Sequence, residues 1–256
     1  MAAVNGPVYV YGVLPSPVEA SISTPGIEGA SVKAVEQDGL VALASPLKSE
    51  ALRAGRDLRA HWRVLQEAFE QTTVLPVRFG TVMESEEAVR EGLLESNSAE
   101  LGAMLRDVVG RVQLGVKGRY DEELLLREIV RDSRAIATLR ERVRRMPERS
   151  ASYAEQVRLG ELVAGEVLRR HEQDLAVALS VLEPLAVATR SEPSLETEVA
   201  FDLAFLVERE EREAFDEAVG RLREALEGRI KVRYIGPMPP YSFAETDLST
   251  RADAWA

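Results

Sequence analysis

The sequence contains no cysteine among its 256 residues. This absence excludes disulfide bonds, thiolate metal sites and cysteine nucleophiles, and it is typical of proteins in a reducing compartment. Histidine is scarce as well, since only His61 and His171 occur. They lie far apart in the sequence, and no carboxylate motif flanks either of them, so they are weak candidates for a metal site.

Long apolar runs are also missing. No stretch approaches 18 uninterrupted apolar residues, and the first residues lack the basic and apolar segments of a signal peptide. We therefore expect a cytoplasmic protein that does not enter a membrane. Positive charge is in deficit, because 32 Lys and Arg stand against 43 Asp and Glu, a formal net charge of -11. Such a field repels phosphate backbones, which argues against nucleic acid as a partner.

The usual signatures of catalysis are not found. The G-V-K-G of residues 115–118 lacks the spacing of a phosphate-binding loop, and no G-x-S-x-G nucleophile elbow occurs. Acidic pairs such as Glu122-Glu123 and Glu210-Glu211 lie in highly charged helical segments, where solvated faces explain them better than acid/base catalysis does. The sequence therefore predicts a protein that is not an enzyme, with no cofactor and no metal.

The hydrophobic fraction of 45% is enough to fill a core, and we expect two α+β units, residues 1–119 and residues 120–256. The first is organised around V-L-P-V-R-F-G-T-V, residues 74–82, a short apolar run between two helical patterns that favours a buried strand. Pro76 and Gly80 interrupt this run. They predict either a bulge or a strand that enters the sheet late.

The rest of the first unit alternates strands and helices. We expect strands at residues 8–14, 31–36, 40–44 and 111–119, and helices at residues 49–71, 85–94 and 98–110. Asp38-Gly39 joins two of the strands and is a strong hairpin signal. With the run at 74–82, the order β-β-β-α-β-α-β predicts a modified ferredoxin-like domain with an extra hairpin strand.

One helix of this unit carries an apolar stripe. Within residues 49–71 the stripe is formed by Leu52, Leu58, Trp62, Leu65 and Phe69, which we expect in the core. His61 is next to Trp62. We favour a histidine at the helix surface or the core edge over the alternatives of a base or a metal ligand.

The second unit is predicted to be a helical hairpin with a small sheet. We expect helices at residues 120–146, 150–182 and 208–228, and strands at residues 185–189, 198–207 and 229–235. The long helix has one apolar side: Tyr153, Val157, Ala164, Leu168, Leu175, Leu179 and Leu182. His171 falls on the same side, so we expect it to be at least half-buried and hydrogen-bonded to a neighbour.

Two groups of cations stand out in this acidic chain. The first group is Arg140, Arg142, Arg144, Arg145 and Arg149. It is either a solvated helix end that complements the helix dipole or a docking site for an acidic partner. The second group, Arg229, Lys231 and Arg233, is either the polar face of a strand or a basic stripe that faces a partner.

The segment G-P-M-P-P-Y-S-F, residues 236–243, contains three prolines and predicts an extended proline-rich tail. Tyr241 and Phe243 in this tail either seal the edge of the second sheet or form a ligand for another protein.

Four motifs, in order along nearly the whole chain, resemble the gas vesicle protein F/L family of accessory assembly proteins. They are Y-V-Y-G-V-L-P at residues 9–15, His61 ahead of the run at 74–82, A-F-L-V-E-R at 204–209 and Y-I-G-P-M-P-P-Y-S-F at 234–243. A departure is Gln113, where the resemblance leads us to expect glutamate.

The resemblance implies a non-enzymatic protein that helps a small hydrophobic shell protein assemble into a gas vesicle, by binding it or by becoming a minor component. It implies an N-terminal modified ferredoxin-like domain, a C-terminal α+β domain, and other gas vesicle accessory proteins as partners. Within the resembling motifs we expect partner contacts from Arg78, Arg233, Tyr234, Tyr241 and Phe243. The alternative is a regulatory module that binds a small molecule on a ferredoxin-like scaffold.

Overall fold

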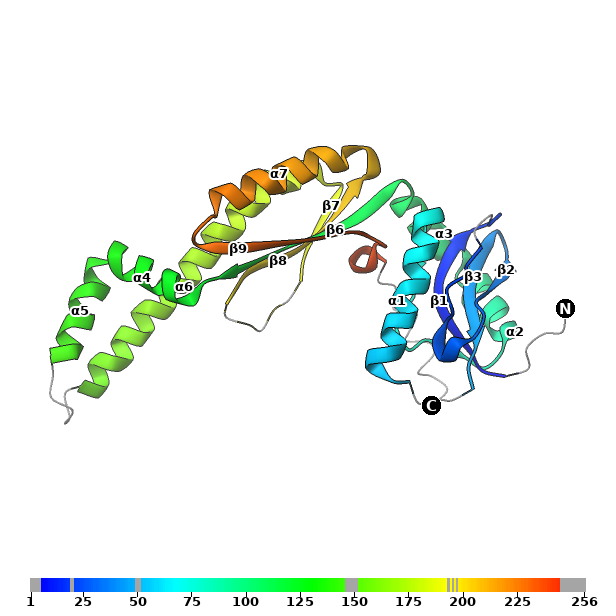
Figure 1. Cartoon of the computed structure of the whole chain (residues 1–256), viewed down its shortest axis with the longest axis horizontal. Helices are drawn as coiled ribbons and strands as arrows, with labels where there is room; N and C mark the ends of the chain where they lie inside the picture. The colour runs from blue at the N-terminus through cyan, green and yellow to red at the C-terminus, as the bar shows by residue number, and fades with distance from the viewer. Residues whose placement is uncertain are drawn as a thin grey trace. The chain divides into compact units, whose positions relative to one another are not determined.

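The computed structural model describes residues 6–18, 21–48, 52–145, 152–192, 194, 196 and 198–244. The described residues form two compact units (Figure 1). One gathers the residues up to Gln113 and those from Gly236 onward, and the other is Leu114–Ile235. Each unit has a sheet with helices packed on it, so the α+β class is confirmed.

The first sheet is centred on β1 (Val8–Pro15), whose residues are buried almost throughout. Its strand order is β2-β3-β1-β4, with β2 at Lys33–Gln37, β3 at Leu40–Pro46 and β4 at Leu75–Pro76. The hairpin between β2 and β3 turns on Asp38 and Gly39, which have φ of 49° and 76°. Two successive positive φ angles are what a tight hairpin turn requires, and the hairpin prediction is confirmed.

The run at residues 74–82 is not one strand, and that prediction is corrected. It forms two dipeptide strands, β4 and β5 (Val82–Met83), which pair separately with β1. Between them the chain turns, with the Thr81 hydroxyl donating to the Arg78 carbonyl at 2.8 Å and Gly80 at φ 98°. A proline without an N–H and a glycine with positive φ together interrupt the ladder.

Three helical segments complete the first unit: α1 (Ala54–Gln71), α2 (Glu86–Ala88) continued by a π-helical stretch (Val89–Glu95), and α3 (Ser98–Val108). The predicted core stripe of α1 is confirmed for Leu65 and Phe69, which are buried, but it is wrong for Leu58 and Trp62. Leu58 and Trp62 are 49% and 48% exposed, whereas Asp57 and His61 are buried beside Leu65. The polar pair can be buried because both side chains find hydrogen-bond partners there.

The second sheet has the order β7-β8-β6-β9, with β6 at Arg111–Tyr120, β7 at Ala188–Ser191, β8 at Val199–Glu208 and β9 at Ile230–Met238. The assignment of residues 111–119 to the first sheet is therefore wrong, because β6 lies between β8 and β9. With β6 as its first strand, the second unit follows the β-α-β-β-α-β order of a ferredoxin-like fold. A strand between two helical regions can join either neighbouring sheet, and local sequence does not decide which.

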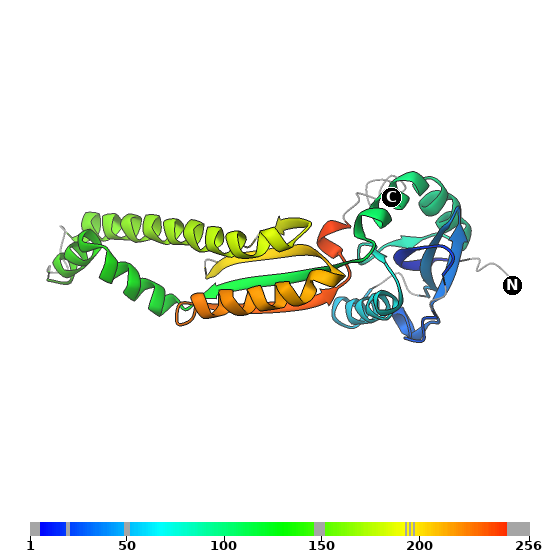
Figure 2. The same ribbon diagram turned by 90° about the horizontal axis from the view of Figure 1, so that it is seen from above.

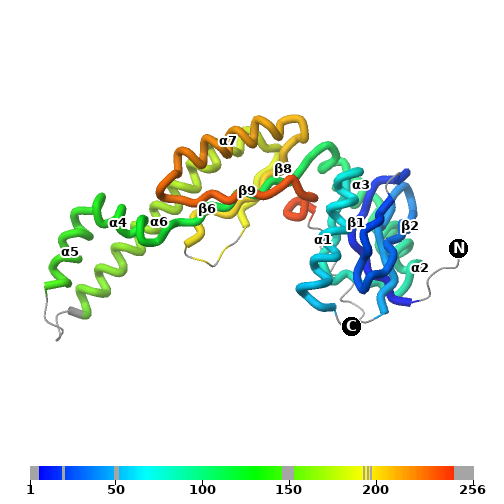
Figure 3. Tube along the Cα trace, in the orientation of Figure 1, coloured from blue at the N-terminus to red at the C-terminus, as the bar shows by residue number. Residues whose placement is uncertain are grey.

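The helices of the second unit are α4 (Glu122–Asp132), α5 (Arg134–Arg145), α6 (Ser152–Leu182) and α7 (Arg212–Ala225). Helices α6 and α7 cover the same face of the sheet (Figure 1), and Figure 2 shows α6 running past the end of the sheet beside α4 and α5. The single helix predicted at 120–146 is two helices with a bend between them (Figure 3). Ser133 stands at the break, where its hydroxyl accepts from the Ile136 N–H at 3.3 Å.

The extended proline-rich tail is not observed. Residues 236–238 continue β9, with a cis peptide bond at Gly236-Pro237, and Tyr241–Phe243 form a 3-10 turn. Arg149 lies outside the described residues. No helix in the described part of the chain is long and apolar enough to cross a membrane.

Candidate functional site

A buried aromatic and polar cluster lies between β1 and α1 in the first unit. His61 is only 2% exposed, and its Nδ1 lies 2.9 Å from the Tyr9 hydroxyl. Its ring stacks on Tyr11 and meets the edge of Phe79, each at a centroid distance of 5.7 Å. Burial lowers the pKa of His61 to about 4, so the ring is neutral at neutral pH. The predicted position at the surface or the core edge is thus corrected to the core.

The hydrogen bonds of this cluster join β1, α1 and the turn before β5. The Gly80 N–H donates to the Tyr9 hydroxyl at 3.0 Å, and the same hydroxyl is hydrogen-bonded to Nδ1 of His61. Nε2 of His61 is buried and has no hydrogen-bond partner among the described residues. Tyr11 accepts from the Ile27 N–H at 2.7 Å and bonds Ser45 at 2.8 Å. Burial raises the pKa of both tyrosines, and the cluster holds together segments far apart in the chain.

Beside this cluster is a hollow of about 490 Å³, lined by Gly26, Glu28, Gly29, Arg56, Asp57 and Ala60. The Asp57 carboxylate accepts from the Arg53 N–H at 2.7 Å and from Nε of Arg56 at 3.1 Å. The bond from the Arg53 N–H lowers the pKa of Asp57 and outweighs the opposing effect of burial. The hollow is thus bordered by a carboxylate that already has two donors.

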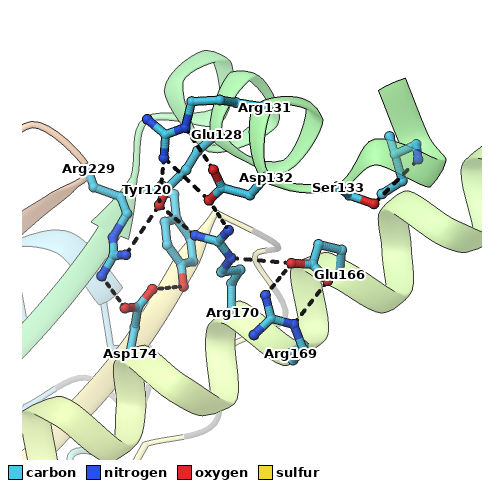
Figure 4. A network of polar contacts seen from close by, with 11 residues as sticks. Tyr120, Glu128, Arg131, Asp132, Ser133, Glu166, Arg169, Arg170, Asp174 and Arg229 are labelled. Atoms are coloured by element: carbon cyan, nitrogen blue, oxygen red, sulfur yellow. Dashed lines mark hydrogen bonds and ion pairs between the residues drawn. The ribbon is translucent and has the colours of Figure 1, made fainter. Parts of the chain in front are cut away.

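A second polar network joins α4, α6 and the sheet of the second unit (Figure 4). The side chain of Arg170 is 8% exposed and contacts Glu128 at 2.5 Å, Asp132 at 2.7 Å and Glu166 at 3.4 Å. Burial alone would lower the pKa of Arg170, but its bonds to Asp132 and Glu128 raise it. The hydrogen bonds from Arg131 and Arg170 lower the pKa of Asp132 to about 2. Every charge at the centre of this network has an opposite charge beside it.

The same network continues to the strands. Asp174 accepts from the Tyr120 hydroxyl at 2.7 Å and pairs with Arg229. Arg229 is therefore a half-buried cation held by Asp174, although the sequence analysis placed it in a stripe with Lys231 and Arg233. The sequence analysis overlooked the charged residues Glu166, Arg170 and Asp174, which follow one another at i, i+4 spacing on the inner side of α6 and would have indicated this network.

His171 is half-buried, and its ring centroid lies 4.8 Å from that of Tyr120. Its Nε2 has no hydrogen-bond partner among the described residues, so the predicted hydrogen bond is replaced there by a ring contact. Burial lowers the pKa of His171.

The residues predicted to contact partners come from both units. Arg78 is exposed in the turn between β4 and β5, and Arg233 is exposed on β9. Tyr234 lies on the helix-covered face of the sheet, since its hydroxyl bonds Asp216 of α7 and its ring lies near Phe215. Their role as contacts stays a prediction.

The other two predicted contacts lie in the 3-10 turn. Tyr241 has a buried hydroxyl with no partner in the described part of the chain, and burial raises its pKa. Phe243 is half-buried. Between them, Ser242 donates its N–H to Oε1 of Gln113 at 2.8 Å, while Nε2 of Gln113 donates to the Ser242 hydroxyl at 3.0 Å. A glutamate at position 113 would lack that donor, so glutamine suits this contact.

Several apolar residues that the sequence analysis placed on apolar helix sides are exposed. Besides Leu58 and Trp62 on α1, the helix α6 exposes 77% of Tyr153, 43% of Val157 and 65% of Leu168. Periodicity marks an apolar side of a helix, but it does not show how far along the helix a partner reaches.

These features define a class of protein: two α+β units, each with a structural network of buried polar side chains, and with apolar side chains exposed on helix surfaces. A model of the gas vesicle synthesis protein GvpL/GvpF family matches residues 7–245, and the chain belongs to that family. The resemblance identified from the four motifs is confirmed.

Relatives match over nearly their whole length. The chain is 31% identical to gas vesicle protein F of Streptomyces sp. (strain CB03234), covering 93% of this chain and 99% of that protein. It is 28% identical to gas vesicle protein F of Nostoc sp. (strain PCC 7120), covering 93% and 98%. Among solved structures it is similar to crystalline GvpF from Anabaena sp. PCC7120, with 27% identity, a TM-score of 0.83 and coverage of 94% and 99%.

Proposed function

We propose that this protein is an accessory factor of gas vesicle assembly that binds the hydrophobic shell protein and makes or breaks no covalent bond. It acts in the cytoplasm at the growing vesicle, with other accessory proteins, and either delivers the shell protein or stays as a minor component. The observation that carries the proposal is the family match over residues 7–245, together with relatives named gas vesicle protein F over more than 90% of the chain. A role in gas vesicle assembly follows from the family; binding of the shell protein is the proposed step.

The physical need for such a factor is simple. A small protein with large apolar faces aggregates unless those faces are covered until they reach their place in the shell. An apolar strand is covered efficiently when it pairs with the free edge of another sheet, because its backbone groups are satisfied at the same time.

The second sheet offers such an edge at β9, which ends the strand order β7-β8-β6-β9. Tyr234 points to α7, so by strand alternation Arg233 and Ile235 point to the opposite face. Both are exposed, Ile235 at 41%. Gly115 of β6 lies beside Ile235 on this face, since a Cβ built on Gly115 would be 3.9 Å from Cβ of Ile235. Lys117 and Asp202 form an ion pair at 2.6 Å on the same face. We propose that a strand of the shell protein adds to β9 here. Arg78, Tyr241 and Phe243 belong to the first unit, and we propose them as separate contacts there.

The test is co-expression with a gas vesicle shell protein, scored as the soluble fraction of the shell protein. The wild-type chain should raise this fraction, and the double variant Arg233→Glu, Ile235→Asp should lose most of the gain. Arg221→Glu is the matched control, because the Arg221 side chain on α7 is 64% exposed and forms an exposed ion pair with Glu217 at 3.8 Å. A wild-type chain that leaves the shell protein insoluble would refute the proposal. A double variant with unchanged melting that still solubilises it would refute the β9 site.

The alternative function is a regulatory module that binds a small molecule. The hollow of about 490 Å³ in the first unit favours it. A ligand there would raise the melting temperature of the wild-type chain through binding linkage. Ala60→Trp would fill the hollow. A metabolite that stabilises the wild type by several degrees but leaves this variant unchanged would favour the alternative.

A further inference from the structure

Helix α6 is longer than the sheet that it covers. Its 31 residues span about 46 Å, whereas the ten-residue strands β6 and β8 span about 33 Å. The C-terminal part of α6 packs over the sheet, where Ala178 and Leu182 are fully buried. The N-terminal part continues beyond the end of the sheet (Figure 2).

One apolar side runs along the whole helix. From Leu182 it steps back at intervals of three, four or seven residues through Ala178, Leu175, Leu168, Ala164, Val157 and Tyr153. The part of this apolar side that faces the sheet, at Ala178 and Leu182, is buried. Beyond the sheet the same side is uncovered, with Leu168 at 65%, Val157 at 43% and Tyr153 at 77% exposure. We call Tyr153, Val157, Gly160, Ala164 and Leu168 the overhanging stripe.

Helices α4 and α5 do not cover this stripe. They pack against another side of α6, where Arg142 of α5 contacts Glu155 at 3.3 Å and Arg170 contacts Glu128 and Asp132 of α4. Residues 155, 166 and 170 lie roughly 120° to 180° around the helix from the centre of the overhanging stripe. Single exposed apolar side chains are ordinary on a protein surface, but a row of them at helical spacing marks an interaction site.

The charge beside the stripe indicates what covers it. Helix α5 carries five arginines and one glutamate in a chain of net charge -11. Arg142 of α5 pairs with Glu155 of α6, and Glu155 lies on the side of α6 opposite to the overhanging stripe. Two positions along a helix correspond to a rotation of about 200°. Arg140 and Arg144, two positions before and after Arg142, therefore point to the other side of α5, the side on which the stripe lies. Both are exposed, the Arg144 side chain at 78%.

We infer that the overhanging stripe and the arginines Arg140 and Arg144 form a docking surface for an acidic amphipathic helix of another protein. The apolar side of that helix lies on Tyr153, Val157 and Leu168, and its carboxylates lie against the arginines. At Gly160 and Ala164 no bulky side chain keeps the two helices apart, and a Cβ built on Gly160 meets nothing within 4 Å. A second copy of this chain fits less well, because pairing two such surfaces brings two arginine-rich helices together.

The surface is independent of the proposed strand pairing at β9, so it is tested without the shell protein. The probe is a fluorescein-labelled designed peptide with leucine at the a and d positions of a heptad repeat and glutamate on its outer face. Its control has lysine in place of glutamate. Fluorescence anisotropy at low salt should show that the full chain binds the acidic peptide, and that added salt weakens the complex.

The variants separate the two parts of the surface. Tyr153→Ser with Leu168→Gln should weaken binding at least about tenfold, as loss of central apolar contacts does. Arg140→Glu with Arg144→Glu should weaken it and reverse the preference between the two peptides. Leu162→Gln is the matched control: Leu162 is on the same helix and 39% exposed, but off the stripe, so binding should not change. All substituted side chains are exposed, and melting temperatures report any loss of folding.

Three results would overturn the inference. The acidic peptide does not bind, or the stripe variants bind it as well as the wild type does, or the lysine peptide binds equally well. Light scattering tests whether a second copy of this chain covers the stripe instead. A dimer mass for the wild type that becomes a monomer mass in the Tyr153→Ser, Leu168→Gln variant would show that a second copy occupies the stripe, which contradicts an acidic partner.

Discussion

At the scale of single residues, His61 shows how a titratable group can serve the fold. It is neutral because burial holds its pKa at about 4, below the value near 6.5 expected in an unfolded chain. The unfolded state therefore binds more protons between these two values, and the free energy of unfolding falls as pH falls through that window. The contribution is fully present above about pH 7, and the shift corresponds to a loss of up to about 3 kcal/mol by pH 4.

The variant His61→Gln tests this expectation. Denaturant unfolding at pH 7.5, 6, 5 and 4.5 should show the wild type more stable at pH 7.5, with the difference from the variant shrinking as pH falls. Carboxylates titrate in both proteins, so the difference isolates the histidine. A difference that stays constant across the series would mean that His61 has the same pKa in the folded and the unfolded chain, and would contradict the effect of burial.

Arg169 and Arg170 are neighbours in sequence with opposite environments. Arg170 is 8% exposed and holds three carboxylates, while Arg169 is 47% exposed and pairs with Glu166. Arg170→Met should cost about 2–4 kcal/mol of unfolding free energy, because Glu128 and Asp132 lose a buried counter-charge. Arg169→Met should cost about 0.5 kcal/mol or less, as exposed pairs do. Urea unfolding measures both, and equal costs would contradict the central role of Arg170.

At the scale of elements, close packing of the second sheet depends on a glycine. A Cβ on Gly118 of β6 would lie 2.5 Å from Cζ of Phe201, whose ring is 4% exposed and has little room to move. Gly118→Ala should therefore destabilise the protein by about 1–3 kcal/mol through overpacking. Gly220→Ala in α7 is the matched control, since its Cβ meets nothing within 4 Å and alanine favours a helix by about 0.5–1 kcal/mol. Thermal melts of the two variants should shift in opposite directions.

Elements that depend on neighbouring residues could be predicted from the sequence. The Asp38-Gly39 turn fixes its hairpin locally, the alternation of β8 marks a strand, and the extent of α6 follows from an unbroken helical pattern. Failures came where distant parts of the chain decide. Which sheet takes β6 depends on the strands beside it, and the buried side of α1 depends on Tyr9 bonding His61. The polar networks were missed for the same reason, since their partners are far apart in the sequence.

At the scale of the whole molecule, net charge keeps apart chains that display apolar surface. Leu58 and Trp62, one turn apart on α1, are each about half exposed, and the net charge of -11 opposes contact between copies at neutral pH. The sequence pI is about 4.9, so this repulsion vanishes near pH 5. Turbidity and sedimentation at pH 7.5 and pH 5 should show a soluble chain at the first pH and association at the second.

The double variant Leu58→Gln, Trp62→Gln leaves the charge unchanged and removes the apolar pair, so it should associate less than the wild type at pH 5. Val109→Gln is the control, because Val109 is 58% exposed but belongs to neither helix surface described above. This substitution should have little effect, since an isolated apolar side chain offers too small a contact to hold two chains together. If both variants associate like the wild type, loss of charge alone drives the association, and the pair on α1 is not an adhesive surface.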